Sequence, residues 1–539
     1  MCIRDSSETQ PPSPEEIASQ VPDPLTALQR LEEEMSRPDL EARERQVLEQ
    51  LRQRLTSLAR PQVVHLSLPD AVRRTLENSY AIQFQGYAPA IDAARVVEAE
   101  AAFDAVFFAN FQNDKQDRPS ASQLEGTKRE NRVFQAGVRK LLASGMQVQT
   151  SYGLTRASSD LIFQTLNPSY FNQFVVEFRQ PFLKGFGLDY NRAQIELRRI
   201  DRRMSVEKLR REIQEQIYNV EQAYWRLYQA RRNVVVSARL LTQLELILRS
   251  LEHREAVGLD VYKVQLKQTE SLIQQRRAEF VRIVNDVRDA EDALLTLMND
   301  PAINLSIRAE IIPTDVPSIE PLTLDAVGEV TAALTNRIEL REARLAIEQA
   351  QLAIGIAKNQ ALPRLDALFR YIVDGLGSNA DRAFSQLSMN DFHEYVVGLE
   401  FEWPIGARAG EAAIRRARLQ QAQAIAGHKV QIEKAILDVR RAMREILTSY
   451  DQIMPSLRAA QASEAQLEAT RARMEKRDPA NLEVELSAHE RLANARLTLL
   501  RVLADYNIAL VNLERQKGTL MKYNNIAIHD IGPDEPPAN

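Results

Sequence analysis

Residues Tyr395–Trp403 read YVVGLEFEW, and this stretch decides the kind of fold that the chain adopts. Its odd-numbered residues are all apolar or aromatic, whereas its even-numbered residues include Gly398, Glu400 and Glu402. A period of two predicts a β-strand with one apolar face and one charged face. A charged face suits a wet lumen better than a protein core, so the pattern is the inverse of that of a soluble barrel.

Three further stretches, 103–111, 174–178 and 365–373, alternate in the same way and have aromatic-rich apolar faces. Four strands of about ten residues result, which is the length that a tilted transmembrane strand needs. Tyr395 and Trp403 stand near strand ends, where an aromatic girdle would lie. The alternative is a small antiparallel sheet packed on helices. Membrane strands are favoured by the charged residues on the predicted lumen face, which are Asp366, Arg370, Glu400 and Glu402.

Four strands cannot close a barrel by themselves, because even small barrels use about eight. An open sheet edge is not tolerated in lipid, where unpaired backbone groups find no water. If these strands lie in a membrane, the barrel must therefore be shared between chains, which predicts an oligomer.

The rest of the chain is predicted to be helical. Arg192–Met298 contains no proline and one glycine, Gly258, and its apolar residues recur at heptad-like spacing from Leu240 to Leu251. Such long helices pair side by side as coiled coils. At about 1.5 Å per residue, each arm beside Gly258 would be roughly 70 Å or more in length.

The same pattern recurs from Glu411 to about Leu520, with a break near Asp478-Pro479. Pro455 predicts a kink or an irregular turn within it. Gly258 and Pro479 would then stand at two hairpin tips at the same end of the molecule.

Composition excludes several classes of function. The net charge of −5 argues against a general nucleic-acid binder. A single cysteine, Cys2, excludes a disulfide framework and a thiolate metal cluster. The six histidines are scattered, and no HExxH, P-loop, GxGxxG or GxSxG motif is present. The sequence therefore predicts no enzyme, no cofactor and no metal site. No apolar run approaches the length of a transmembrane helix.

Four sequence segments recur in the same order in the two halves of the chain, which indicates an internal duplication. We expect a first repeat at 63–312 and a second at 313–520, preceded by a Pro-rich segment and charged helix at 1–62 and followed by a polar tail at 521–539. The first repeat carries an insert at about 114–169 with a strand-like pair. That pair could lengthen a barrel outward, form an extracellular hairpin or add two strands to the wall.

The ordered set of motifs resembles the TolC-like outer-membrane efflux family over about residues 63–520. The resemblance rests on the doubled helix start at Leu66-Ser67-Leu68 and Leu322-Thr323-Leu324, the strand ends Gln180–Gly187 and Trp403–Gly406, and the final helix Leu492–Asn507.

The resemblance implies a homotrimer in the cell outer membrane, with a 12-stranded barrel continuous with a periplasmic α-helical tunnel. Such a protein is a passive exit duct of tripartite efflux or type I secretion systems for small molecules or proteins. An inner-membrane transporter supplies energy, and a periplasmic adaptor docks on the hairpin tips. An exported protein needs a signal peptide, so Met1–Ser7 is interpreted as a replaced start; the alternative is a cytosolic protein.

The resemblance also suggests where function resides. Acidic rings at the periplasmic end make such pores cation-selective. Gate candidates are Asp260, Asp478, Glu483 and Glu485, with Arg254 and Arg477 beside them. Adaptor-docking candidates are Val257, Gly258, Leu259, Val261, Ala480, Asn481 and Leu482. The alternatives are ordinary solvated charges and intramolecular turn packing. The alternative function is a soluble periplasmic coiled-coil adaptor or scaffold without a membrane barrel.

Overall fold

The structure is a computed structural model that describes residues 62–119, 126–161, 164–257, 263–303, 309–474 and 481–527. The chain divides into two compact units. Among the described residues, the sheet unit comprises 85–211 and 338–434, and the coiled-coil unit comprises 62–84, 212–337 and 435–527.

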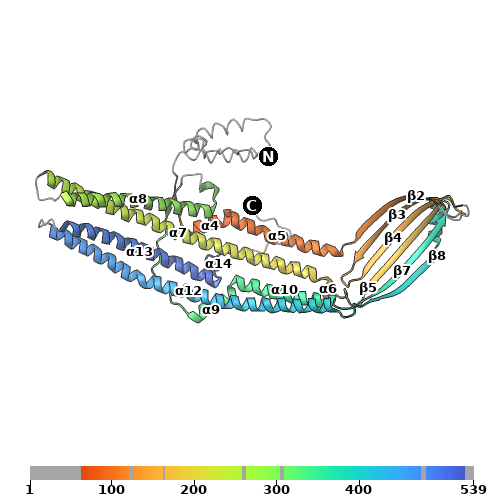
Figure 1. Cartoon of the computed structure of the whole chain (residues 1–539). Helices are drawn as coiled ribbons and strands as arrows, with labels where there is room; N and C mark the ends of the chain where they lie inside the picture. The colour runs from red at the N-terminus through yellow and green to blue at the C-terminus, as the bar shows by residue number, and fades with distance from the viewer. Residues whose placement is uncertain are drawn as a thin grey trace, which may run out of the picture. The chain divides into compact units, whose positions relative to one another are not determined.

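The sheet unit contains a six-stranded antiparallel sheet with the strand order β2-β3-β4-β5-β7-β8 (Figure 1). Its strands are β2 (Val106–Asp117), β3 (Lys128–Leu141), β4 (Gln147–Ser159), β5 (Ser169–Pro181), β7 (Arg364–Gly377) and β8 (Phe392–Glu402). The four stretches predicted as strands are therefore strands, and the first begins at Val106 because residues 101–103 form a 3-10 turn, η2.

The insert accounts for the two additional strands. The hairpin β3–β4 lies between β2 and β5, so the insert adds strands to the wall of the sheet, which is one of the three expected possibilities. Its turn requires glycine, because Gly145 has φ +94° and a Cβ there would lie 2.4 Å from the carbonyl oxygen of Gly185.

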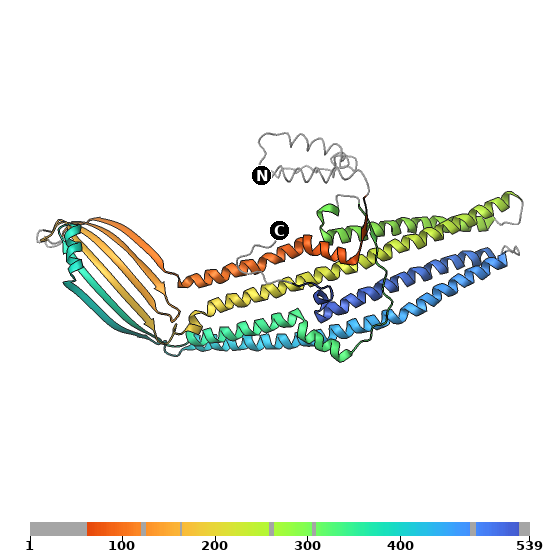
Figure 2. The ribbon, with the colours of Figure 1, turned by 180° about the vertical axis from the view of Figure 1, so that it is seen from behind.

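Four long helices of the sheet unit lie side by side in the order α5, α7, α10 and α12 (Figures 1 and 2). Ion pairs link neighbours: Arg199 of α7 contacts Glu100 of α5 at 2.9 Å, and Arg203 contacts Glu348 of α10 at 2.6 Å. The helices of this unit, some of which continue beyond it, are α5 (Tyr80–Glu100), α6 (Leu188–Asn191), α7 (Ala193–Ala256), α10 (Ile338–Gln360), α11 (Ala380–Met389) and α12 (Arg408–Met474).

The coiled-coil unit begins with β1 (Gln62–Leu66), which pairs in parallel with β6 (Ala309–Pro313). Its other elements are α4 (Leu68–Asn78), α8 (Lys263–Met298), η3 (Pro301–Ile303), α9 (Ala326–Asn336), α13 (Asn481–Lys517) and α14 (Leu520–Tyr523). Ser67 caps α4 by accepting a hydrogen bond from the backbone N–H of Asp70. The helices α4 and α5 are separated at Ser79, whose backbone is extended.

The long helices differ from expectation in two respects. α7 has 64 residues and α8 has 36, so at 1.5 Å per residue the first arm spans about 96 Å and the second only about 54 Å. Pro455 lies inside the continuous helix α12 and does not form an irregular turn. An interior proline costs roughly 3 kcal/mol, and on the same helix the buried residues Ile446 and Ile453 pack against α13.

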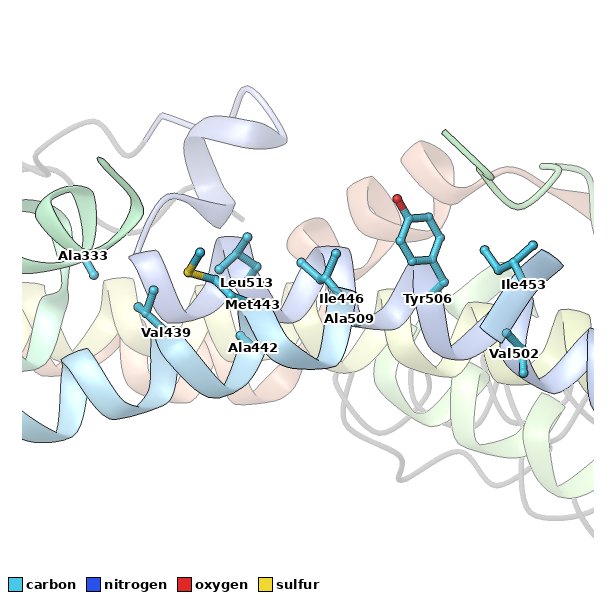
Figure 3. Close-up of a cluster of buried hydrophobic side chains, with 10 residues drawn as sticks. All are labelled: Ala333, Val439, Ala442, Met443, Ile446, Ile453, Val502, Tyr506, Ala509 and Leu513. Atoms are coloured by element: carbon cyan, nitrogen blue, oxygen red, sulfur yellow. The ribbon is translucent and has the colours of Figure 1, made fainter. Parts of the chain in front are cut away.

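The coiled-coil unit has a core between α12 and α13, shown in Figure 3. Buried residues recur every three or four positions on both helices, which is the spacing of a coiled-coil seam. They are Val439, Ala442, Met443, Ile446 and Ile453 on α12, and Val502, Tyr506, Ala509 and Leu513 on α13. The heptad predicted on α7 forms a second cluster, in which Leu244 and Leu251 pack against Ile273 of α8 and Leu486 of α13.

The order of elements recurs along the chain. α4, α5, β2, β5, α7 and α8 are matched by α9, α10, β7, β8, α12 and α13. Matched helices have similar lengths: 11 residues for both α4 and α9, and 36 and 37 residues for α8 and α13. The boundaries of the two repeats remain a prediction.

Candidate functional site

One face of the sheet is apolar and exposed. Cross-strand register places the apolar positions of all six strands on this face, because directly paired residues point to the same side. On β8, Tyr395, Val397 and Leu399 are 70–75% exposed, and Phe107 and Phe111 of β2 are 70% and 71% exposed. A monomeric soluble protein rarely exposes so large a continuous apolar surface, so this face is built to contact another apolar medium.

The helix α11 covers part of the apolar face, over β5 and β7. Gly375 of β7 lets it approach closely, since a Cβ there would lie 2.1 Å from the carbonyl oxygen of Ala383. Phe384 of α11 packs edge-on against Tyr152 of β4, with ring centroids 6.4 Å apart.

The opposite face carries a network of ion pairs. Arg364 contacts Asp366 at 2.9 Å and Glu400 at 3.3 Å. Arg179 contacts the same two carboxylates at 3.8 and 3.3 Å. The network crosses β5, β7 and β8, and it pairs acidic with basic side chains on this face.

All four predicted lumen residues stand on the charged face, and three of them meet. Asp366, Glu400 and Glu402 gather around Arg364, whose distance to Glu402 is 3.7 Å. Arg370 pairs separately with Glu177 at 2.6 Å. Sequence reasoning did not list Arg179 and Arg364 as site residues, although the period of two that identified Asp366 places Arg364 on the same face.

The sheet has two edges. Within the described ranges, β2 pairs only with β3, and β8 pairs only with β7, so the outer backbone groups of both strands have no strand beside them. These are the strands with the most exposed apolar side chains. An edge of this kind needs a partner, because unpaired backbone groups beside apolar surface form a template for another strand.

The coiled coil α7–α8 is joined to the coiled coil α12–α13 by polar contacts. Arg276 of α8 contacts Glu490 of α13 at 2.5 Å. Arg471 of α12 donates to Gln243 of α7 at 2.7 Å and contacts His489 of α13 at 3.2 Å. These contacts lie on the parts of the four helices that are nearer to the predicted hairpin tips.

The predicted gate residues have different surroundings. Glu485 is nearly buried and lies 3.8 Å from Arg471 and from His489. Glu483 is exposed in the first turn of α13, and Arg254 is half-buried in the last turn of α7. Asp260, Asp478 and Arg477 lie outside the described residues.

Four of the seven predicted docking residues lie outside the described residues. Val257, directly after α7, is 64% exposed. Asn481 and Leu482 begin α13. The remaining candidates, which are Gly258, Leu259, Val261 and Ala480, fall outside the part of the chain that the structure describes.

A buried carboxyl group that sequence reasoning missed lies on α7. Glu221 is 1% exposed, and the side-chain amide of Asn524 donates a hydrogen bond to its carboxyl group at 2.9 Å. Burial raises the pKa of Glu221 to about 7, and the Asn524 hydrogen bond opposes that rise. One turn further along, the Tyr224 hydroxyl donates to Asp315 at 2.5 Å.

Within the described ranges, no group of three or more His, Cys, Asp or Glu side chains is placed to hold a metal ion. No helix among the described residues is long and apolar enough to cross a membrane.

Comparison with known families gives one match. Residues 330–519 match the family model described as outer membrane efflux protein. No curated protein sequence matches the chain.

Several solved structures share the fold. CusC is 16% identical with a TM-score of 0.63, over 84% of this chain and 92% of its own. The Campylobacter jejuni CmeC outer membrane channel is 15% identical with a TM-score of 0.64, over 84% and 86%. The Neisseria gonorrhoeae MtrE outer membrane channel, in its open state, is 16% identical with a TM-score of 0.61, over 84% and 89%.

Proposed function

We propose that three copies of this chain assemble into the passive exit duct of a tripartite export system, because residues 330–519 match the outer membrane efflux protein family and the chain shares the fold of CusC and CmeC. The apolar sheet face contacts outer-membrane lipid, and the charged face lines a wet lumen. A periplasmic adaptor and an inner-membrane transporter complete the system and supply the cargo and the energy. The duct itself has no catalytic role.

The single observation that carries this proposal is the six-stranded sheet with an exposed apolar face and two unpaired edges. In lipid each unpaired backbone group costs several kcal/mol, so the edge strands β2 and β8 require neighbours. The β2 edge of one copy and the β8 edge of the next satisfy each other in a head-to-tail ring. The soluble-scaffold alternative leaves both the apolar face and the edges uncovered.

The helices of the sheet unit support the same contact. α5, which leads into β2, exposes Tyr87, Ile91 and Val97 at 52–59%. α12, which follows β8, exposes Leu419 and Val430 at 61% and 59%. α5 and α12 are the outer members of the row of four helices, so their apolar stripes can pack between copies where the sheet edges meet.

Membrane fractionation tests the proposal directly. We expect the full-length protein in the outer-membrane fraction, as a trimer that resists SDS at room temperature and dissociates on heating. Amine cross-linking before extraction should stop at three copies. A monodisperse soluble monomer in the absence of detergent would contradict the proposal and favour the scaffold.

We propose that Asp478 and Glu483 form acidic rings at the periplasmic end of the pore. Three copies of a carboxylate at a constriction concentrate negative charge and favour cations. The double variant Asp478→Asn/Glu483→Gln is therefore expected to lower the cation-to-anion permeability ratio towards unity in planar-bilayer recordings. Asp451→Asn, at an exposed position in the interior of α12, is the control and should leave the ratio unchanged. An unchanged ratio in the double variant would refute the assignment.

We propose that the adaptor docks on the hairpin tips. Val257 is exposed at the end of α7, and small and apolar residues surround Gly258 in the sequence, which suits contact with a partner helix. Gly258→Trp is expected to abolish pull-down by a purified cognate adaptor. Val281→Trp places the same side chain on an exposed position of α8 away from the tip and should retain binding. Equal retention by both variants would place the docking surface elsewhere.

A further inference from the structure

We propose that the barrel closed by three copies has eighteen strands, six from each chain, and that the exit is consequently wider than the twelve-stranded barrel implied by the family resemblance. This inference rests on the proposed trimer. It depends on whether the hairpin β3–β4 is part of the barrel wall or an appendage outside it.

Backbone pairing places the hairpin in the wall. Val106–Asp117 of β2 pairs along its whole length with Lys128–Arg139 of β3. β4 pairs in the same continuous way with β5 from Gln147 to Ala157. Direct pairing of β2 with β5, which a four-stranded contribution requires, would break both ladders and return their backbone groups to lipid, where they find no water.

The side chains of the hairpin follow the same division into two faces. Phe134, Val138 and Tyr152 lie on the apolar face, and the exposed fractions of Phe134 and Val138 are 41% and 44%. Gln135 and Gln149 lie on the charged face, between the polar residues of β2 and β5. An appendage outside the wall would not need one apolar and one polar side in register with both neighbouring strands.

The turn of the hairpin is fixed to the rest of the sheet unit, and the two strands of the hairpin are fixed to each other at its open end. At one end, the backbone N–H of Gly187 donates to the carbonyl of Ser144 in the β3–β4 turn at 3.3 Å, and Gly145 packs against Gly185. At the other end, Asp160 accepts hydrogen bonds from the backbone N–H groups of Thr127 and Lys128 at 3.2 and 3.0 Å. The turn at 142–146 continues into no helix, so the hairpin widens the barrel without adding a helix to the row of four.

The width of a barrel follows from its strand number. At a given tilt the diameter grows roughly in proportion to the number of strands, so eighteen strands give a diameter about half as large again as twelve and about twice the cross-section. Barrels of 16–18 strands leave an aqueous channel, whereas those of about eight are filled by side chains. The exit therefore suits bulkier cargo than a twelve-stranded exit does.

Disulfide cross-linking in outer membranes tests the strand order. In a Cys2→Ser background, the pairs Ala109→Cys/Ala136→Cys (β2–β3) and Thr150→Cys/Val176→Cys (β4–β5) should each cross-link within one chain on oxidation. Ala109→Cys combined with Phe174→Cys, Val176→Cys or Phe178→Cys (β2–β5) should not. Cysteine pairs scanned along β2 and β8 should link different copies into a covalent trimer.

The outcomes separate the two proposals. Cross-links between β2 and β5 in a protein that is still trimeric would refute eighteen strands and leave the export duct intact. If no trimer forms, the proposed export duct is refuted, whatever the cross-links between β2 and β8. Trimers with β2–β3, β4–β5 and intermolecular β2–β8 links establish the strand order of the eighteen-stranded wall.

A size-exclusion measurement tests whether the two additional strands widen the exit. Leu368→Cys, on the charged face, is labelled in intact cells with maleimide-polyethylene glycols of increasing mass added outside. The comparison protein joins Asp117 to Ser169 through a Gly-Ser-Gly linker, so that β2 and β5 become neighbours and each chain contributes four strands. We expect its mass cut-off to fall below that of the complete chain. Equal cut-offs in two trimeric proteins would show that the hairpin does not widen the lumen.

Discussion

Replacement of Val397 by lysine is expected to abolish accumulation of the trimer in the outer membrane. Val397 lies in the middle of β8 on the apolar face, and its side chain is 72% exposed. In water, a charge at so exposed a position changes stability by no more than about 0.5 kcal/mol. On a lipid-facing strand near the bilayer midplane, a lysine costs about 2–4 kcal/mol, and a trimer carries that cost in each of its three copies.

The adjacent residue is a matched control. Val396 has the same side chain and stands next to Val397 on the same strand, but it points to the charged face, opposite Arg370. Val396→Lys should therefore assemble, because water in the lumen solvates the ammonium group. Both variants are compared by the amount of heat-modifiable trimer in outer-membrane fractions. Equal accumulation of the two variants would mean that lipid does not cover the apolar face.

Glu221→Gln is expected to stabilise the protein at pH 8 by about 3 kcal/mol per chain and to have no effect at pH 4. The pKa of Glu221 is raised from 4.5 to about 7 in the folded protein, and each unit corresponds to about 1.4 kcal/mol. Below pH 4.5 the carboxyl group is protonated in both states, so the folded state carries no penalty. As the pH rises from 4.5 through 7, the unfolded state gains from ionisation and stability is lost.

Glutamine avoids this loss because it stays neutral and keeps an oxygen that can accept the Asn524 hydrogen bond. Thermal unfolding of the detergent-solubilised protein, followed by helical circular dichroism from pH 4 to 8, measures the difference. Glu252→Gln, at an exposed position of α7, is the control and should show no pH-dependent gain. A variant less stable than the parent protein at pH 8 would contradict burial as the source of the shift.

The alternation of apolar and charged residues predicted the strands because it is a local property with a period of two. It identified β7 and β8 nearly to their ends, and it placed Asp366 and Glu400 on one face before the register was known. The heptads around Leu244 predicted the α7–α8 pairing for the same reason. Such patterns indicate which side of a helix or strand is apolar.

Local sequence patterns could not predict features that depend on contacts between distant segments of the chain. Glu221 is an ordinary glutamate of a long helix in the sequence, and its pKa is raised because the tertiary fold buries it, although the Asn524 hydrogen bond opposes that rise. Arg364 joins the charged network because β7 lies between β5 and β8. The local sequence likewise did not predict the break at Ser79 or the continuity of α12 through Pro455.

The sequence by itself determined that the chain combines long paired helices with strands that have one apolar and one charged face. It also determined that these strands need partners, because the periodicity and the number of strands follow directly from the order of residues. It left open where the strands of the insert belong. Only the tertiary structure placed β3 and β4 inside the sheet, between β2 and β5. The physical reason is that strands pair through backbone hydrogen bonds, and the backbone groups that form them are the same at nearly every residue. The side-chain pattern therefore indicates which face of a strand is apolar, but it does not indicate which strand is its neighbour.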